Sequence, residues 1–305
     1  MVLSLLVRPV SLPNDMAGLE GLFQLCFETD EHWPIGEHKY LALLRGADRE
    51  SVATVVEFDG ELVGFSQLVP NAEGVWALEL ATHPLRRSLG VLDVLVEQAI
   101  RDALKQGASS IRMWVYQPGV ASHLHQFGFI QERELRQMRI ALPIAASRPG
   151  PSDAEIRTFV VGDDEGAWLT LNNRVFAAHP ENGSWTREVL EDRIAQPWFD
   201  AAGFLVAWSG EQMIGFCWTK VPEDGSGEIY VIAVDPTKSG GGLGRYLVES
   251  GLRYLYEKRD CLTGLLYVDA DNQRALDLYD GMGFWVDHID RSFIVETGTR
   301  SAVRS

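Results

Sequence analysis

Residues 234–245 read Val-Asp-Pro-Thr-Lys-Ser-Gly-Gly-Gly-Leu-Gly-Arg, and their pattern gives the strongest indication of the fold. It follows a segment at 228–234 that is typical of a strand, and it leads into a segment at 243–258 with leucines at helical spacing. Glycines allow the backbone to approach a ligand closely, and the N–H groups at the start of a helix attract an anion. A strand, a glycine loop and a helix in this order predict a phosphate site. The loop is not a Walker loop, because it lacks the Gly-Lys-Ser/Thr ending.

The stretch belongs to the second of two similar halves of the chain. The matching segments, in order, are 59–65 with 209–216, 78–84 with 230–236, and 126–129 with 281–284. Corresponding glycines stay at a nearly constant offset: Gly64 and Gly215 are 151 residues apart, and Gly128 and Gly283 are 155 apart. Agreement in both order and spacing indicates an internal repeat.

A stretch rich in proline, serine and glycine lies near the midpoint of the chain and predicts a linker. We therefore predict an N-terminal domain at 1–143, a linker at 144–153 and a C-terminal domain at 154–305. The length of 305 residues agrees with two domains of ordinary size.

The patterns of the second half predict a definite order of strands and helices. They are a strand at 155–161, helices at 164–177 and 186–195, strands at 203–208, 213–221 and 228–234, a helix at 243–258, a strand at 264–268, a helix at 272–279 and two closing strands. Antiparallel strands followed by a strand–helix–strand unit predict a mixed α/β (α+β) domain. We expect two such domains in tandem, each a mostly antiparallel sheet with one parallel crossover, flanked by helices.

Composition excludes several classes of protein. Hydrophobic residues make up 46% of the chain and charged residues 23%, which is typical of globular proteins. The apolar opening stops at Arg8, and no later run approaches the ~20 residues of a membrane span. The 43 acidic residues exceed the 27 basic ones, so we expect no nucleic-acid or membrane partner. The cysteines are scattered, which predicts a cytoplasmic protein. His123 and His125 form an isolated pair without further ligands nearby, so we expect no metal.

A second motif stands at 272–284, Asn-Gln-Arg-Ala-Leu-Asp-Leu-Tyr-Asp-Gly-Met-Gly-Phe. Together with the Val-Asp-Pro strand end and the glycine loop, it resembles the GCN5-related N-acetyltransferases (the GNAT family). In that family the loop holds the pyrophosphate of acetyl-CoA. The resemblance implies an acetyl-CoA-dependent N-acetyltransferase that uses acetyl-CoA as co-substrate. The chain departs from the family at Ser239, where Gln or Arg is usual, and at Gly241, where a basic residue is usual. Both changes keep the backbone N–H donors.

The resemblance also implies roles for individual residues. Glu228 matches the general base of the family, and Tyr279 matches the acid beside the CoA sulfur. Backbone N–H groups of Ile232, Ala233 and Val234, near the end of the preceding strand, would polarise the thioester carbonyl. The residues that the resemblance places against acetyl-CoA in the second half are Ile232, Ala233, Val234, Ser239, Gly240, Gly241, Gly242, Leu243, Gly244, Arg245, Asn272, Arg274 and Ala275.

Further blocks, including 172–185 and 265–272, resemble tandem members of the family that acetylate a thiol glycoside. Their acceptor is the cysteinyl amine of 1-D-myo-inosityl-2-L-cysteinylamido-2-deoxy-glucopyranoside, and the resemblance implies the same small-molecule substrate for this chain, which we expect to act as a monomer. The residues that match acceptor contacts of these enzymes are Glu37, Glu181, Lys220, Glu228 and Tyr267.

The first half lacks counterparts of the two catalytic residues. By spacing, Trp76 stands at the position of Glu228 and Leu124 at that of Tyr279. We therefore expect the first domain to be non-catalytic, and either to hold CoA in a structural role or to bind none. In the first case its contacts would be Leu80, Ala81, Thr82, Arg87 and Gly90.

Two other functions stay open at this point. The chain is either a tandem acetyltransferase for another small amine or a peptide N-terminus, or an acetyl-CoA-binding sensor without turnover. The pair Glu228 and Tyr279 argues against the sensor, because binding alone requires neither residue.

Overall fold

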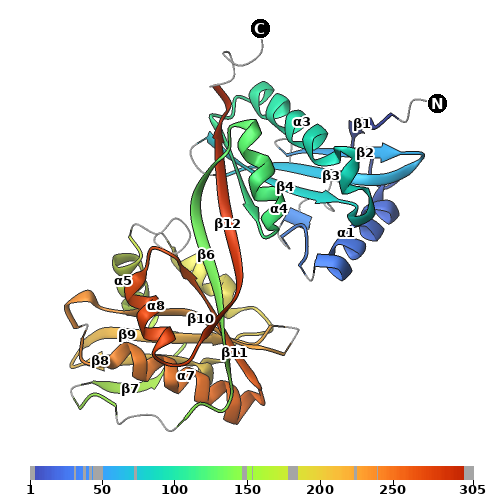
Figure 1. Cartoon of the computed structure of the whole chain (residues 1–305). Helices are drawn as coiled ribbons and strands as arrows, with labels where there is room; N and C mark the ends of the chain where they lie inside the picture. The colour runs from blue at the N-terminus through green and yellow to red at the C-terminus, as the bar shows by residue number, and fades with distance from the viewer. Residues whose placement is uncertain are drawn as a thin grey trace. The chain divides into compact units, whose positions relative to one another are not determined.

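The computed structural model describes residues 4–30, 32–36, 39–40, 43, 51–71, 74–145, 150–152, 154–177, 185–222, 225–238 and 240–298. The chain forms two compact units (Figure 1). Unit 1 comprises Met1–Glu134 and Asp290–Ser305, and unit 2 comprises Leu135–Ile289. The predicted boundaries at 143 and 154 follow the repeat in the sequence, whereas the two units are defined by contacts in the structure. The predicted boundaries therefore stay a prediction.

Unit 1 is a sheet with helices on both faces. Its strands are β1 (Leu6–Pro9), β2 (Val52–Phe58), β3 (Glu61–Pro70), β4 (Val75–Thr82) and β5 (Ser110–Val115), and its helices are α1 (Met16–Asp30), η2 (Pro84–Leu89), α3 (Val91–Lys105), α4 (Pro118–Leu124) and η3 (His125–Phe127). Neighbouring strands are antiparallel, except that β4 and β5 are parallel. Leu19 and Phe23 of α1 pack on Phe65 on one face, whereas Leu95 of α3 packs on Val63 on the other.

Unit 2 repeats this plan. Its strands are β6 (Ile130–Ala141, from residue 135), β7 (Glu155–Thr158), β8 (Phe204–Ser209), β9 (Gln212–Lys220), β10 (Gly227–Val234), β11 (Thr263–Asp269) and the first part of β12 (Trp285–Glu296). Its helices are α5 (Glu165–Val175), α6 (Arg187–Ile194), η4 (Ala201–Gly203), η5 (Pro236–Lys238), α7 (Leu243–Arg259) and α8 (Gln273–Asp280). Strands β10 and β11 are parallel, whereas the pairs β7–β8, β8–β9, β9–β10 and β6–β11 are antiparallel. The predicted sheet with one parallel crossover is confirmed.

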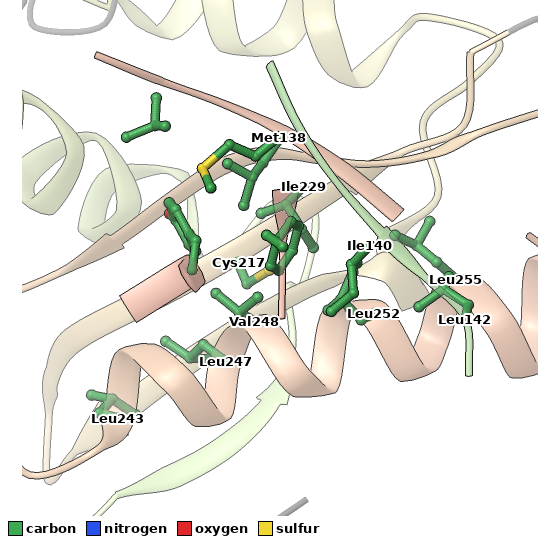
Figure 2. Packing of buried hydrophobic residues seen from close by; sticks show 14 of the residues in the cluster. Met138, Ile140, Leu142, Cys217, Ile229, Leu243, Leu247, Val248, Leu252 and Leu255 are labelled. Atoms are coloured by element: carbon green, nitrogen blue, oxygen red, sulfur yellow. The ribbon is translucent and has the colours of Figure 1, made fainter. Parts of the chain in front are cut away.

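The leucine-rich face predicted for 243–258 packs on the sheet of unit 2. Its side chains point toward strands β6 and β10 (Figure 2). Burying one such aliphatic side chain contributes about 1.5–3 kcal/mol, so this face holds α7, and the glycine loop before it, in place. The helix residues are Leu243, Leu247, Val248, Leu252 and Leu255, and the strand residues that they meet include Met138, Ile140 and Ile229.

Each unit takes one strand from the other half of the sequence. Residues 135–141 of β6 pair with β11 in unit 2, and residues 291–296 of β12 pair with β5 in unit 1. The prediction of two closing strands is therefore wrong. A single strand, β12, closes the fold, because its first part belongs to unit 2 and its second part continues into the sheet of unit 1.

The same kind of ion pair ties β1 to the start of α1 in unit 1 and β7 to the start of α5 in unit 2. Arg8 donates from Nη1 to Oδ2 of Asp15 at 2.7 Å, and Arg157 donates from Nη1 to Oδ2 of Asp164 at 2.6 Å. These guanidinium groups lower the pKa of both carboxyls. The backbone N–H of Val160 also donates to Asp164, so β7 ends at Thr158 rather than at 161 as the alternation predicts.

Candidate functional site

Strands β10 and β11 part in the middle of unit 2. Their parallel pairing covers residues 227–229 and 264–266, whereas β10 continues to Val234 and β11 to Asp269. A β-bulge in β10 shifts the register with β9 between Ile229 and Val231, so Tyr230 is the extra residue. The bulge lies where the strands separate, and it leaves one edge of β10 without a strand neighbour beyond this point.

Backbone N–H groups face this open edge. Asp235 donates its N–H to the carbonyl of Ile214 on the β9 side at 2.8 Å. Backbone groups alternate along a strand, so the N–H of Ala233 also faces β9. The N–H groups of Ile232 and Val234 then face the opening toward β11. Two of the three residues predicted to polarise a carbonyl therefore present a donor there.

The side chain of Asp235 anchors the start of the loop. Its Oδ1 accepts from the N–H and the hydroxyl of Thr237 at 3.0 and 2.8 Å, and its Oδ2 accepts from Arg174 on α5 at 2.5 Å. Burial alone would raise the pKa of this carboxyl, but the bonds from Thr237 and Arg174 lower it. The sequence analysis missed Asp235 and Arg174 as loop anchors, although the Val-Asp-Pro motif contains the first of them.

The glycine loop is open to a ligand. Gly240 and Gly242 have φ values of 101° and 82°, which side-chain-bearing residues rarely adopt. A Cβ at residue 240, 241 or 242 would meet no described atom within 4 Å. Among the described residues no side chain caps α7, so the N–H groups of Leu243, Gly244 and Arg245 face outward. Ser239, predicted in the same loop, lies outside the described residues.

The predicted base and two predicted acceptor contacts share one face of the sheet. Glu228 on β10 lies directly opposite Lys220 on β9 and Leu265 on β11. Tyr267 is two residues beyond Leu265, so its side chain projects from the same face. The structure thus brings Glu228, Lys220 and Tyr267 together. Glu37 and Glu181, the other predicted acceptor contacts, lie outside the described residues.

Lys220 is held over aromatic rings. Its Nζ lies 5.1 Å from the ring centroid of Trp198 and 5.5 Å from that of Tyr230. Both distances are those of cation–π contacts. Trp218, which precedes Lys220 by two residues on the same face, packs with Trp168 of α5. The base therefore lies on the face that α5 and α6 cover.

A residue of β6 orients Tyr267. Gln137 Nε2 donates to the Tyr267 hydroxyl oxygen at 2.6 Å, and Gln137 Oε1 accepts from Arg139 at 3.3 Å. Asp287 holds Arg139 in turn, at 2.7 Å from its Nε. Because Arg139 donates to Oε1 of Gln137, the Nε2 end of the amide faces the Tyr267 hydroxyl. The sequence analysis missed Gln137, because it belongs to the first half of the sequence although it contributes to unit 2.

Tyr279 lies on the opposite face. It is 6% exposed and packs with Leu247 of α7 and Leu276 of α8. Burial, with Cys217 nearby, raises its pKa, so the hydroxyl stays protonated at neutral pH. That hydroxyl makes a hydrogen bond to none of the described residues. Glu228 and Tyr279 therefore flank the parted strands from opposite sides of the sheet.

The second motif builds the helix that carries this tyrosine. Asn272 is the N-cap of α8, and its Oδ1 accepts from the N–H of Ala275 at 3.2 Å. Arg274 is exposed on the first turn of the helix. The structure thus shows a capping role for Asn272, and its predicted contact with acetyl-CoA stays a prediction, as do those of Arg274 and Ala275.

Strands β4 and β5 of unit 1 part as β10 and β11 do in unit 2, but the helix that follows has an acidic residue in its first turn. Strand β4 pairs with β5 over residues 75–77 and continues beyond that pairing through the predicted Leu80, Ala81 and Thr82, which still pair with β3 on the other side. Asp93 stands in the first turn of α3, three residues after Gly90, where unit 2 has Arg245 after Gly242. The Asp93 carboxylate contacts His123 Nε2, and Arg245 donates to Glu249 at 2.8 Å, so each of these side chains has a partner in its own unit.

The other predicted unit 1 positions fit this difference. The Arg87 guanidinium is paired with Asp30. Trp76 and Leu124, the counterparts of Glu228 and Tyr279, are buried in the core. Unit 1 therefore keeps the parted strands and the glycine before the helix, and its non-catalytic role stays a prediction.

The described residues contain no group of three or more His, Cys, Asp or Glu side chains able to hold a metal ion. None of the helices in this part of the chain combines the length and apolar character needed to cross a membrane.

Comparison with known proteins identifies the class. The acetyltransferase (GNAT) family model matches residues 17–129 and again 168–284, so the chain belongs to the GNAT family, and the predicted tandem arrangement is confirmed. The chain is 40% identical to a protein named mycothiol acetyltransferase from Acidimicrobium ferrooxidans, over 90% of this chain and 92% of the relative. It is 41% identical to a protein of the same name from Streptomyces coelicolor, over 93% of each.

Solved structures share the fold. A GCN5-related N-acetyltransferase from Sphaerobacter thermophilus aligns with a TM-score of 0.75 at 23% identity and covers 96% of both chains. A tandem GNAT protein from the clavulanic acid biosynthesis pathway aligns with a TM-score of 0.72 at 18% identity, over 97% of this chain and 99% of that one. At these identities the likeness concerns the fold alone.

Proposed function

We propose that the protein transfers the acetyl group of acetyl-CoA to the cysteinyl amine of 1-D-myo-inosityl-2-L-cysteinylamido-2-deoxy-glucopyranoside, which produces mycothiol. The observation that carries the proposal is the parting of β10 and β11, with Glu228 on one side and Tyr279 on the other. The names of the relatives support the choice of acceptor. The second half of the sequence performs the chemistry.

Acetyl-CoA would bind along the open edge of β10. The N–H groups at the start of α7 receive the pyrophosphate, and the φ values of Gly240 and Gly242 keep the loop backbone close to it. The thioester then lies between the parted strands. The N–H groups of Ile232 and Val234 donate to its carbonyl oxygen, and they stabilise the negative charge that develops there when the amine attacks.

The proton transfers follow from the two faces. Glu228 accepts one proton from the protonated acceptor amine, and the neutral nitrogen then forms a bond to the thioester carbon and releases a second proton to solvent. An α-amino group has a pKa of about 8, so the base needs to provide only modest assistance. When the carbon–sulfur bond breaks, the departing thiolate takes the proton of the Tyr279 hydroxyl, which burial keeps protonated.

The acceptor would lie on the face that Lys220 and Tyr267 share with Glu228. Sugar hydroxyls need hydrogen-bond partners, and Tyr267 is 44% exposed and held by Gln137. The predicted contacts with Glu37 and Glu181 remain part of the proposal. The purified protein should release CoA with the full glycoside far faster than with cysteinamide or an aminoglycoside. Equal rates with cysteinamide would reduce the assignment to a general small-amine acetyltransferase.

Replacing Tyr279 by phenylalanine should lower kcat about tenfold and leave acetyl-CoA affinity nearly unchanged. The change removes the hydroxyl that protonates the leaving thiolate, whereas the ring keeps its place between α7 and α8. Steady-state kinetics and calorimetric titration with acetyl-CoA measure the two quantities. A loss of affinity with unchanged kcat would instead assign Tyr279 a packing role.

Replacing Gln137 by leucine should raise the KM for the acceptor about three- to tenfold, with little change in kcat or in the KM for acetyl-CoA. The substitution removes the donor that orients the Tyr267 hydroxyl. The double variant Gln137→Leu with Tyr267→Phe tests whether Gln137 acts through Tyr267. If it does, the effects of the two substitutions on the acceptor KM should not be additive. Additive effects would contradict the positioning role.

A further inference from the structure

Unit 1 contains a buried amide without a hydrogen-bond partner among the described residues. The side chain of Gln67 on β3 is 0% exposed. Within the part of the chain that the structure describes, neither its Nε2 nor its Oε1 has a hydrogen-bond partner. Leaving both ends of a buried amide unpaired is costly, and natural proteins rarely do so without a reason.

The fold itself does not require a polar residue there. Gln67 lies opposite Glu79 on β4, in register with the pairs Gly64–Thr82 and Phe65–Ala81. In unit 2 the corresponding register pairs are Gly215–Val234 and Phe216–Ala233, and the place of Gln67 and Glu79 is taken by Trp218 and Val231. Both of those residues are buried in an apolar cluster. The same sheet position therefore accepts two largely apolar side chains, of which Trp218 has one buried indole N–H without a partner among the described residues.

Further polar groups of unit 1 gather around the amide. The Glu79 carboxylate is paired with the Lys39 ammonium, and the Asp30 carboxylate with the Arg87 guanidinium. Burial, together with the nearby Asp30, Cys26 and Glu79, raises the pKa of Tyr116, so its hydroxyl stays protonated. Each charge in this cluster has an opposite charge beside it.

The ion pair of this cluster is partly exposed to solvent. Glu79 lies two residues beyond Ala77, where the pairing of β4 with β5 ends. The side chains of Glu79 and Lys39 are 19% and 28% exposed, whereas Gln67, directly opposite Glu79 on β3, is fully buried. A small molecule could therefore contact the ion pair first and the amide at the inner end.

We propose that this cluster, formed by Gln67, Glu79, Lys39 and Tyr116, binds a neutral polyhydroxylated small molecule, such as a sugar or cyclitol ring. An amide both donates and accepts, and adjacent hydroxyls match it: one accepts from Nε2 while the next donates to Oε1. The paired charges offer no excess charge to attract an ion. The site is distinct from the acetyl-transfer site of unit 2, and its existence does not depend on the proposed reaction.

Calorimetric titration and thermal unfolding of the full chain with myo-inositol and with methyl α-glucoside test the proposal. For the wild type, at least one ring should release or absorb heat in a saturable manner and raise Tm with increasing concentration. Gln67→Met keeps the shape and removes the amide. We expect it to abolish the ligand effect and to raise the Tm of the ligand-free chain by about 2–4 °C, since an unpaired polar group is lost.

Ser66→Ala is the matched control, because Ser66 neighbours Gln67 on β3 but projects from the other face. It should keep the ligand effect, and both variants should retain the wild-type rate of acetyl transfer. If Gln67→Met fails to fold, Gln67→Asn, which withdraws the amide by one methylene, should weaken binding at least about tenfold. Absence of binding of either ring to the wild type, or unchanged binding to the Gln67 variants, would overturn the proposal.

The same experiment distinguishes a ring that is part of the acceptor from a ring that belongs to a separate small molecule. The proposed acceptor carries both a cyclitol and a sugar, so it is titrated as a third ligand. Two binding events in the wild type, one of which disappears in Gln67→Met, would identify the acceptor itself as the occupant. Binding of a free ring without a second acceptor event would identify a separate small molecule.

Discussion

Replacing Glu228 by glutamine is expected to lower kcat about 100-fold or more at neutral pH. Glutamine keeps the size of the side chain and its place opposite Lys220, but it cannot accept a proton from the attacking amine. Recovery should be partial above the pKa of the amine, about 8, where the acceptor loses its proton to solvent without help. The measurement is a profile of kcat against pH with saturating acetyl-CoA and acceptor.

The control for this experiment is Glu211→Gln. Glu211 is an exposed carboxylate in the turn between β8 and β9, so the change removes one negative charge from unit 2 outside the site. We expect wild-type kcat across the pH range. If Glu228→Gln were also as active as the wild type at every pH, Glu228 would have no part in the proton transfer, and the base would have to be sought elsewhere on the same face.

Features specified by neighbouring residues were predictable. The glycine loop was recognisable because its strand, its glycines and its helix are contiguous, and the structure ends β10 at Val234 and begins α7 at Leu243 as expected. The helix predicted at 186–195 is also found, because Thr186 accepts from the N–H of Val189 and caps the start of α6. Local periodicity and capping chemistry suffice for such elements.

Features that depend on distant pairing were not predictable. Nothing in the alternation of β6 indicates that residues 135–141 pair with β11, because a strand pattern shows which face is buried and not which strand lies alongside. For the same reason Gln137 was overlooked as a partner of Tyr267. The orphaned amide of Gln67 is another example, since its lack of partners is a property of the packed structure.

The difference between the two units in their expected affinity for an anion could have been predicted from one position in the sequence. Aligning Gly90 with Gly242 places Asp93 against Arg245, and this reversal of charge predicts a poor anion site in unit 1. The sequence analysis weighed Arg87 instead. In the structure that side chain is paired with Asp30, so its charge is compensated within the unit.

Replacing Gly242 by valine is expected to abolish acetyl transfer. Gly242 has a φ of 82° at the start of α7, a conformation that a β-branched residue resists. No described atom lies within 4 Å of a Cβ at this position, so the substitution meets no clash in the protein itself. The loop must then change its backbone, which turns the first N–H groups of α7 away from the pyrophosphate, or it must present a side chain where the ligand approaches. Calorimetry should detect no acetyl-CoA binding at concentrations that saturate the wild type.

Gly90→Val separates this effect from general destabilisation. Gly90 has a φ of 74° at the start of α3 and no described atom within 4 Å of its Cβ position, so the strain is the same in kind and of similar size, about 1–3 kcal/mol. The two variants should therefore lose similar amounts of Tm. Only Gly242→Val should lose activity, because Asp93 makes the α3 start unsuitable for an anion. Equal losses of activity from both would mean that unit 1 binds acetyl-CoA productively, and would contradict the assignment of the chemistry to unit 2.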